Sequence, residues 1–160
     1  MHFNYLYRVN SWTQILILLQ RSLYAEEMVC AMSSQLFHIP QTKDLKGSSE
    51  MHNHLVPASY HRVTAVGSAQ RLANGEQQQS IVQTMTACII NAENRDKKVR
   101  EGLKIMEDNA TPDFKPFIKL IIQWQNQAES YLSQTKAALK SMGISFPAGS
   151  EQQSGEYNAY

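Results

Sequence analysis

Asp96 and Gln125 are the two strongly polar residues that interrupt the most regular apolar stripes of this 160-residue chain. If the chain reverses near residue 110, antiparallel positions whose numbers sum to roughly 220 face each other. Asp96 then lies opposite Trp124 and Gln125. A carboxylate buried without a partner is costly. The spacing therefore predicts a small polar site inside a helical bundle, or an Asp96 turned outward to pair with Arg100 while Gln125 fixes the register.

Phe117, Trp124 and Tyr131 recur at intervals of seven residues beside the second apolar stripe. They widen that stripe, so the helix that carries them should contact more than one neighbour. Aromatic side chains of this kind anchor protein interfaces, and they also fill cores. With Asp96 and Gln125, these three residues are the candidate binding residues of the chain.

Several histidines gather before residue 62. His52, His54 and His61, with Glu50, could bind a metal ion if a loop closed around it. The alternative is that they are solvent-exposed loop residues. No second cluster of Cys or His fixes a geometry, so we assign no metal ligand and expect no cofactor.

Composition and motifs narrow the classes of function further. The chain lacks a phosphate-binding glycine loop, Gly-x-Ser-x-Gly, His-Glu-x-x-His and Cys-x-x-Cys, so we expect no enzyme. The net charge of +1 argues against a nucleic-acid partner. Cys30 and Cys88 form neither a disulfide framework nor a zinc motif.

Two long amphipathic helices must position the candidate residues. Their apolar positions alternate in steps of three and four, which is a heptad rhythm. The first stripe consists of Val82, Met85, Ile89, Ala92, Asp96, Val99, Leu103 and Met106, and the second of Phe114, Ile118, Ile121, Gln125, Ala128, Leu132, Thr135, Leu139 and Met142. Such broad stripes favour a bundle over an isolated coiled coil.

The ends of the second helix carry their own signals. Thr111 can cap it, with Pro112 in the first turn. Pro116 favours a later start, near residue 113 or 114. Gly143 suits a left-handed cap, with Ile144 folding back onto Leu139 as in a Schellman motif.

The first half of the chain is less regular. A capping box at residues 11–14 predicts a helix over 11–37, preceded by an N-terminal extension, residues 1–10. A secretory signal cleaved after Ala25 is the alternative, but its apolar run, residues 15–19, is short. That run is also too short for a membrane span, so we favour a bundle helix and a cytoplasmic location. A natural start at Met32 or Met51 is a further alternative.

Residues 38–59 are expected to be a linker, because Pro40, Gly47 and Pro57 punctuate them. A helix over 60–74 follows, with its inner face formed by Val63, Val66, Ala69 and Leu72 or Ala73. Asn74-Gly75 should end it, although one helix over 60–108 is the alternative. Residues 148–160 are polar and small, which predicts a disordered tail.

The expected fold is therefore all-α: one domain, residues 11–147, forming an antiparallel bundle of about four helices, 11–37, 60–74, 77–108 and 112–142.

Two segments carry a resemblance to a known family. Residues 104–115 (Lys-Ile-Met-Glu-Asp-Asn-Ala-Thr-Pro-Asp-Phe-Lys) and 139–147 (Leu-Lys-Ser-Met-Gly-Ile-Ser-Phe-Pro) are similar to the helical hairpin of ferritin-like four-helix bundles, in particular uncharacterised bacterial members. The resemblance implies a bundle fold and, in metal-binding members, paired Glu-x-x-His motifs. This chain contains no Glu-x-x-His, so no metal ligand is carried over.

We expect a non-enzymatic bundle that binds a protein partner or a second copy of itself through the aromatic face around Phe117, Trp124 and Tyr131. The alternative is a ferritin-like or histidine-loop metal-binding protein that uses Glu93, Asp96 and Glu129 or the histidines.

Overall fold

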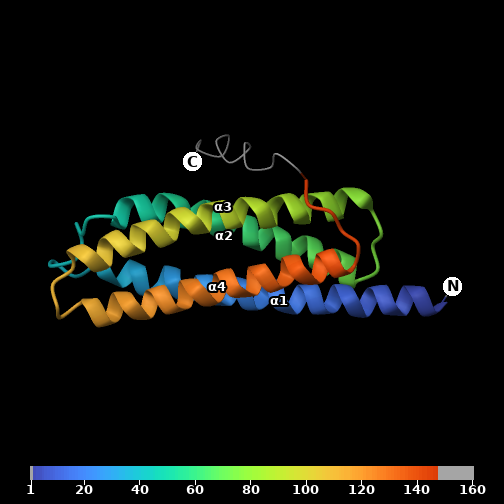
Figure 1. Cartoon of the computed structure of the whole chain (residues 1–160), viewed down its shortest axis with the longest axis horizontal. Helices are drawn as coiled ribbons and strands as arrows, with labels where there is room; N and C mark the ends of the chain where they lie inside the picture. The colour runs from blue at the N-terminus through green and yellow to red at the C-terminus, as the bar shows by residue number, and fades with distance from the viewer. Residues whose placement is uncertain (1, 148–160) are drawn as a thin grey trace.

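The computed structural model describes residues 2–147, which form four helices and no strand (Figure 1). The helices are α1 (His2–Leu36), α2 (Ser48–Ala73), α3 (Gln79–Asn109) and α4 (Lys115–Ser141). The predicted all-α bundle is thus confirmed. The predicted disordered tail, residues 148–160, lies outside the described residues.

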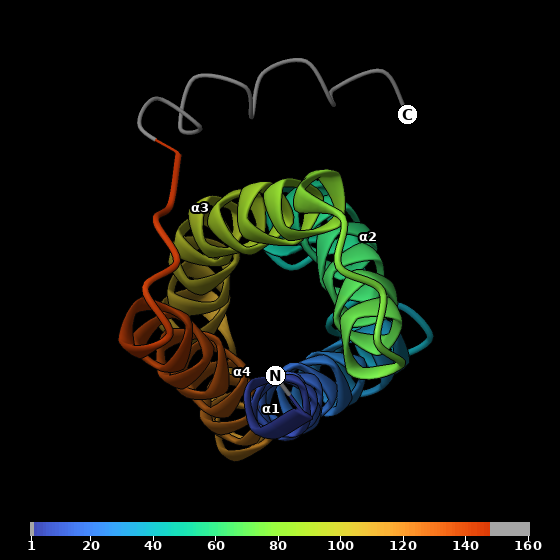
Figure 2. The same ribbon diagram turned by 90° about the vertical axis from the view of Figure 1, so that its right-hand side faces the viewer.

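The helices run up, down, up and down, and viewed along the bundle they follow one another in a ring (Figure 2). Each helix contacts the two helices beside it in the ring, and the closest pairings are α2 with α3 and α1 with α4. The connections, residues 37–47, 74–78 and 110–114, are all short. Short connections between antiparallel neighbours are typical of simple up-and-down bundles.

The core is built from one heptad seam on each helix. All members of these seams are buried: Ile15, Leu19, Ser22, Glu26, Val29, Ser33 and Leu36 on α1; Met51, Leu55, Ala58, Arg62, Ala65, Ala69 and Leu72 on α2; Met85, Ile89, Ala92, Asp96, Val99, Leu103 and Met106 on α3; Ile118, Ile121, Gln125, Ala128, Leu132, Thr135 and Leu139 on α4. The two predicted stripes and the chain reversal near residue 110 are therefore confirmed.

The predicted linker over 38–59 is confirmed for residues 38–47 but is wrong beyond them, because α2 begins at Ser48. Pro57 lies inside the helix, where its missing N–H leaves the carbonyl of Asn53 without its usual donor. Met51, Leu55 and Ala58 lie on the core side of this segment, and all three are buried. Their burial outweighs the cost of the proline, so the helix continues through it.

The predicted inner face of the second helix is confirmed at Ala69 and Leu72, which are buried, but it is wrong at Val63. Val63 is 53% exposed, whereas its neighbour Arg62 is fully buried. Besides Arg62, the core side of α2 carries the small buried residues Ala58, Ala65 and Ala69. The predicted helix start at residue 11 is also wrong, since α1 begins at His2 and includes residues 2–10 of the predicted extension.

Helix ends follow the predicted glycine signals. Gly143 has φ +80°, and the N–H of Ile144 donates to the carbonyl of Leu139 at 3.0 Å, which is a Schellman ending. Gly75 likewise has φ +100° and ends the segment after α2, so residues 60–108 are not one helix. At the start of α4, Pro116 rather than Pro112 occupies the first turn.

None of the helices in the described part of the chain combines the length and apolar character that crossing a membrane requires.

Gly102 of α3 lies very close to the start of α2. A Cβ atom on Gly102 would lie 2.7 Å from the Cβ of Met51 and 3.0 Å from its Cα. Gly47, just before α2, has φ +93° and would place a Cβ 2.7 Å from the carbonyl oxygen of Gly102. The two glycines let the start of α2 lie directly against α3.

We expect Gly102→Ala to lower the free energy of unfolding by about 1–3 kcal/mol, because the new methyl group overlaps the backbone of α2. The matched control is Gly67→Ala, since in the described part of the chain a Cβ at Gly67 meets no atom within 4 Å beyond the adjoining helix backbone. That substitution should stabilise the exposed helix by up to about 1 kcal/mol. Urea denaturation of both variants measures the difference, and equal stability would contradict the close approach.

Candidate functional site

A layer of polar residues crosses the middle of the bundle. Each helix contributes one seam residue to it: Glu26 from α1, Arg62 from α2, Asp96 from α3 and Gln125 from α4. None of the four is more than 1% exposed. The prediction that Asp96 and Gln125 lie inside the bundle is confirmed, whereas the alternative pairing of Asp96 with Arg100 is wrong.

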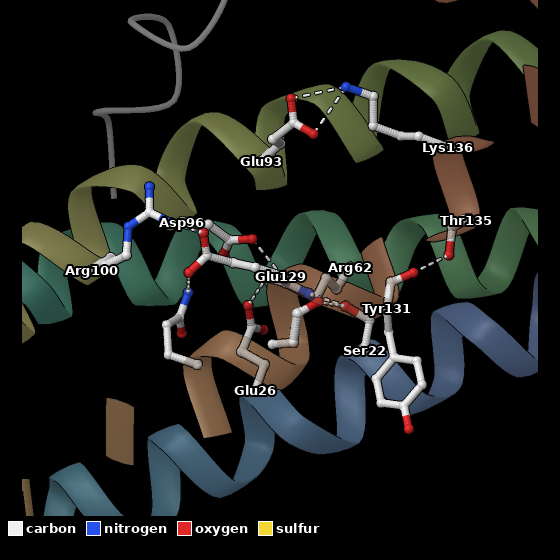
Figure 3. A network of polar contacts seen from close by, with 12 residues as sticks. Ser22, Glu26, Arg62, Glu93, Asp96, Arg100, Glu129, Tyr131, Thr135 and Lys136 are labelled. Carbon is white, nitrogen blue, oxygen red and sulfur yellow. Dashed lines mark hydrogen bonds and ion pairs between the residues drawn. The ribbon is translucent and has the colours of Figure 1, made fainter. Parts of the chain in front are cut away.

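Arg62 is the centre of this layer (Figure 3). Its Nη1 and Nη2 atoms donate to the two carboxylate oxygens of Asp96, at 2.8 and 2.6 Å. Nη1 also donates to Glu26, and Nε donates to the hydroxyl oxygen of Ser22 at 2.9 Å. The Ser22 hydroxyl donates in turn to the carbonyl of Ala128 on α4, at 2.7 Å. One guanidinium thus ties all four helices together.

The charges of this cluster, defined as Glu26, Arg62 and Asp96, do not cancel. Two carboxylates face one guanidinium, and all three side chains are almost completely buried. The pKa of Glu26 is raised from 4.5 to about 7, because burial and the nearby Asp96 raise it more than Arg62 lowers it. Near neutral pH the cluster therefore relieves its excess negative charge by protonating Glu26.

A second row of ion pairs lies on the outer side of α3 and α4. Arg100 donates to Glu129 at 2.9 Å, and Lys136 donates to both carboxylate oxygens of Glu93 at 2.9 Å (Figure 3). Gln125 donates to the other oxygen of Glu129 at 3.4 Å. Burial, followed by Asp96, raises the pKa of Glu129.

These contacts bear on the metal-binding alternative. Glu93, Asp96 and Glu129 each pair with a different cation. From residue 2 to residue 147, no group of three or more His, Cys, Asp and Glu side chains is arranged to hold a metal ion, as far as these side chains are described.

The histidines lie on α2 rather than in a loop. His52 packs against the ring of Phe37, with centroids 4.6 Å apart, and His54 Nδ1 lies 3.0 Å from Arg95 Nη1. His61 is buried beside Tyr60. Burial lowers the pKa of all three imidazoles, so they favour the neutral form. Because all three lie on a helix, they do not form the closed metal-binding loop that their spacing suggested.

The aromatic residues of α4 form a surface with α1. A groove of about 450 Å³ lies on the surface between the two helices. Its lining comprises Ile17, Gln20, Arg21, Tyr24, Ala25, Trp124, Gln127 and Tyr131. The ring of Tyr24 meets Trp124 edge-on at 6.0 Å, and Arg21 lies 6.0 Å from the ring centre of Tyr131.

Exposure on this surface is uneven. Tyr24 is 58% exposed and Ile17 is 42% exposed, whereas Trp124 and Tyr131 are half-buried. Leu120 does not line the groove, but it stands four residues before Trp124 on α4, about one helical turn away, and is 47% exposed. We call the surface of Ile17, Arg21, Tyr24, Leu120, Trp124 and Tyr131 the α1–α4 face. Phe117 is half-buried and packs against the core near the α3–α4 turn, outside the groove.

A larger cavity of about 600 Å³ lies at the other end of the bundle, beside the α2–α3 connection and the end of α4. Its lining includes Trp12, Val82 and Met142, and its one ionisable residue is Glu76. Glu76 pairs with Arg71 at 2.7 Å. The lining offers no set of groups for acid–base or nucleophilic chemistry.

Sequence reasoning missed Glu26, Arg62 and Tyr24. The signal for Arg62 was present, because it stands four residues after Ala58 and three before Ala65 in a heptad seam. Glu26 has the same spacing in the α1 seam, because it stands four residues after Ser22 and three before Val29. Both seams contain too many small or polar residues to be recognised as apolar stripes.

Comparisons with family models, with curated proteins and with solved structures each found no match to this chain. The resemblance to ferritin-like bundles is not tested by these comparisons and stays a prediction.

Arg62→Leu should lower the free energy of unfolding by about 3–5 kcal/mol, because it leaves two buried carboxylates without their cation. Arg71→Leu is the control, since Arg71 is exposed and its pair with Glu76 should contribute little. Chemical denaturation measures both variants. An Arg62 variant as stable as the control would show that the cluster is not an energetic constraint.

Glu26 predicts a distinctive dependence of stability on pH. Its pKa is raised from 4.5 to about 7 on folding, so the folded protein holds this proton more tightly than the unfolded chain. The resulting contribution to the free energy of unfolding is fully present below pH 4.5 and is lost as pH rises through 7. Relative to Glu26→Gln, the unmodified protein should lose up to about 3 kcal/mol of stability across this window. Denaturation curves of both proteins at several pH values test this.

The three histidines with lowered pKa values have the opposite slope in the same range, because the unfolded chain binds their protons more tightly. They are common to both proteins, so the difference between the two curves isolates Glu26. A difference that does not change with pH would contradict the raised pKa.

Proposed function

We propose that this protein acts without catalysis, by binding a partner protein through the α1–α4 face. The observation that carries the proposal is the exposure of Tyr24, Ile17 and Leu120 around the half-buried Trp124. Tyr, Trp and Arg are the residues most enriched at the centres of protein interfaces.

The α1–α4 face is separate from the side chains that fill the core. The heptad seams of α1 and α4 point inward, whereas Tyr24 and Leu120 lie outside them. Folding alone therefore does not account for the exposed rings. A groove between two helices, lined by aromatic residues, is a surface on which an amphipathic helix can lay its apolar side.

The buried cluster supports this proposal by fixing the two walls of the groove. Ser22 on α1 donates to Ala128 on α4, and each residue lies within four positions of a groove residue, Tyr24 or Trp124. A surface held rigid before binding loses less conformational entropy when a partner arrives.

The chemistry of the groove suggests the kind of partner. Arg21 is the one charged residue in its lining, and the other members are apolar, aromatic or amide side chains. We infer an amphipathic helix with apolar residues at i, i+4 and i+7 and a carboxylate that meets Arg21.

Selection from a displayed library of helical peptides tests the proposal. We expect the selected peptides to carry that pattern and to bind the double variant Tyr24→Ala/Leu120→Ala at least about tenfold more weakly. Arg21→Glu should weaken the binding of acidic peptides in particular. Because these residues are exposed, the melting temperature should change little.

Val56→Ala is the matched control, since Val56 is an exposed apolar residue on α2. Peptides that bind the Tyr24→Ala/Leu120→Ala variant as tightly as the unmodified protein would overturn the assignment of this face, and so would a selection that yields no binder.

A further inference from the structure

A second apolar stripe lies on the outer side of α2. Val56, Tyr60 and Val63 are 63%, 57% and 53% exposed, and they are spaced by four and three residues. Exposed positions continue the same rhythm at both ends. We call the whole row the outer α2 seam: Ser49, Asn53, Val56, Tyr60, Val63, Gly67 and Gln70.

The outer α2 seam has the features of a helix-packing surface. It contains no charged residue, and its spacing is that of the core seam on the opposite side of α2. Figure 2 shows α1 and α3 on either side of α2, so neither neighbour covers its outer side.

Gly67 is a second, independent feature of a helix-packing surface. Apart from the adjoining backbone of α2 itself, no atom of the described residues lies within 4 Å of the position that its Cβ would occupy. Packing within the chain therefore does not require glycine here, although glycine weakens an exposed helix. A glycine in a helical seam allows a second helix to come close.

We propose that a second copy of this chain packs antiparallel against the outer α2 seam. In the best register, Tyr60 of each copy lies beside Val63 of the other, and Val56 fills the space beside Gly67. Asn53 then meets Gln70. Large side chains thus face small ones in every central layer, so the seam is complementary to itself.

The same register aligns opposite charges. Glu50 and Arg71 flank the seam on one edge, near its two ends, and the antiparallel arrangement brings Glu50 of each copy against Arg71 of the other. A parallel pair would leave them at opposite ends, about 30 Å apart at 1.5 Å per residue. Complementary flanking charges of this kind set the orientation of paired helices.

Arg71 already pairs with Glu76 of its own chain at 2.7 Å, and both side chains are about half exposed. An exposed pair of this kind is weak enough to share its guanidinium with a second carboxylate. This inference does not rest on the proposed function, because the outer α2 seam and the α1–α4 face share no residue.

Sedimentation velocity over a series of protein concentrations tests the proposal. We expect a reversible dimer, with Tyr60→Glu and Val63→Glu each abolishing it while helix content by circular dichroism stays unchanged. Glu50→Arg should raise the dissociation constant by about tenfold, because two like-charged pairs replace two opposite ones. The swap Glu50→Arg/Arg71→Glu should restore most of the affinity.

Tyr24→Glu, on the α1–α4 face, is the matched control and should leave the dimer intact. A protein that stays monomeric at every concentration would overturn the proposal. A dimer that survives Tyr60→Glu, or one that Tyr24→Glu abolishes, would place the contact on another surface and overturn it equally. Failure of the charge swap to rescue Glu50→Arg would exclude the antiparallel register.

Discussion

The structure depends on the guanidinium of Arg62, which is fully buried and must satisfy partners on both sides of the bundle. Arg62 binds Asp96 on one neighbouring helix and Glu26 with Ser22 on the other. Removing a charge from water is tolerable only when such contacts are complete. A shift of one helix by a single residue would separate these groups. The cluster therefore selects one register for helices whose apolar seams, with their repeated Ala and Leu, would accept several.

That register also determines what the surface presents. With Glu26 and Arg62 turned inward, Tyr24 and Tyr60, each two residues earlier on its helix, lie on the outside. The α1–α4 face and the outer α2 seam are thus consequences of the polar layer as well as of the local sequence. The protein combines a core fixed by charge with two exposed apolar surfaces of different composition, one rich in aromatics around Arg21 and the other without charge.

The hairpin of α3 and α4 could be predicted from the sequence because its seams carry large aliphatic residues and its ends carry glycine and proline signals. Asp96 and Gln125 were found for the same reason, as interruptions of a clear pattern. The start of α2 could not be predicted, because Pro57 and the histidines hide the seam of Met51, Leu55 and Ala58. Because the valines of this segment suggest an inner face that includes Val63, Arg62 does not stand out as a core residue, and the partner of Asp96 is missed.

The unequal closeness of the helices has a consequence for the response to dissolved ions. The bundle consists of two tight pairs, α1 with α4 and α2 with α3, and the boundary between α3 and α4 is crossed by the exposed or half-exposed contacts of Arg100 with Glu129 and Lys136 with Glu93. Electrolyte screens such contacts, whereas it hardly reaches a guanidinium sealed from water. A high salt concentration should therefore weaken the contact between α3 and α4 first, while the buried contacts of Arg62 with α1 and α3 persist.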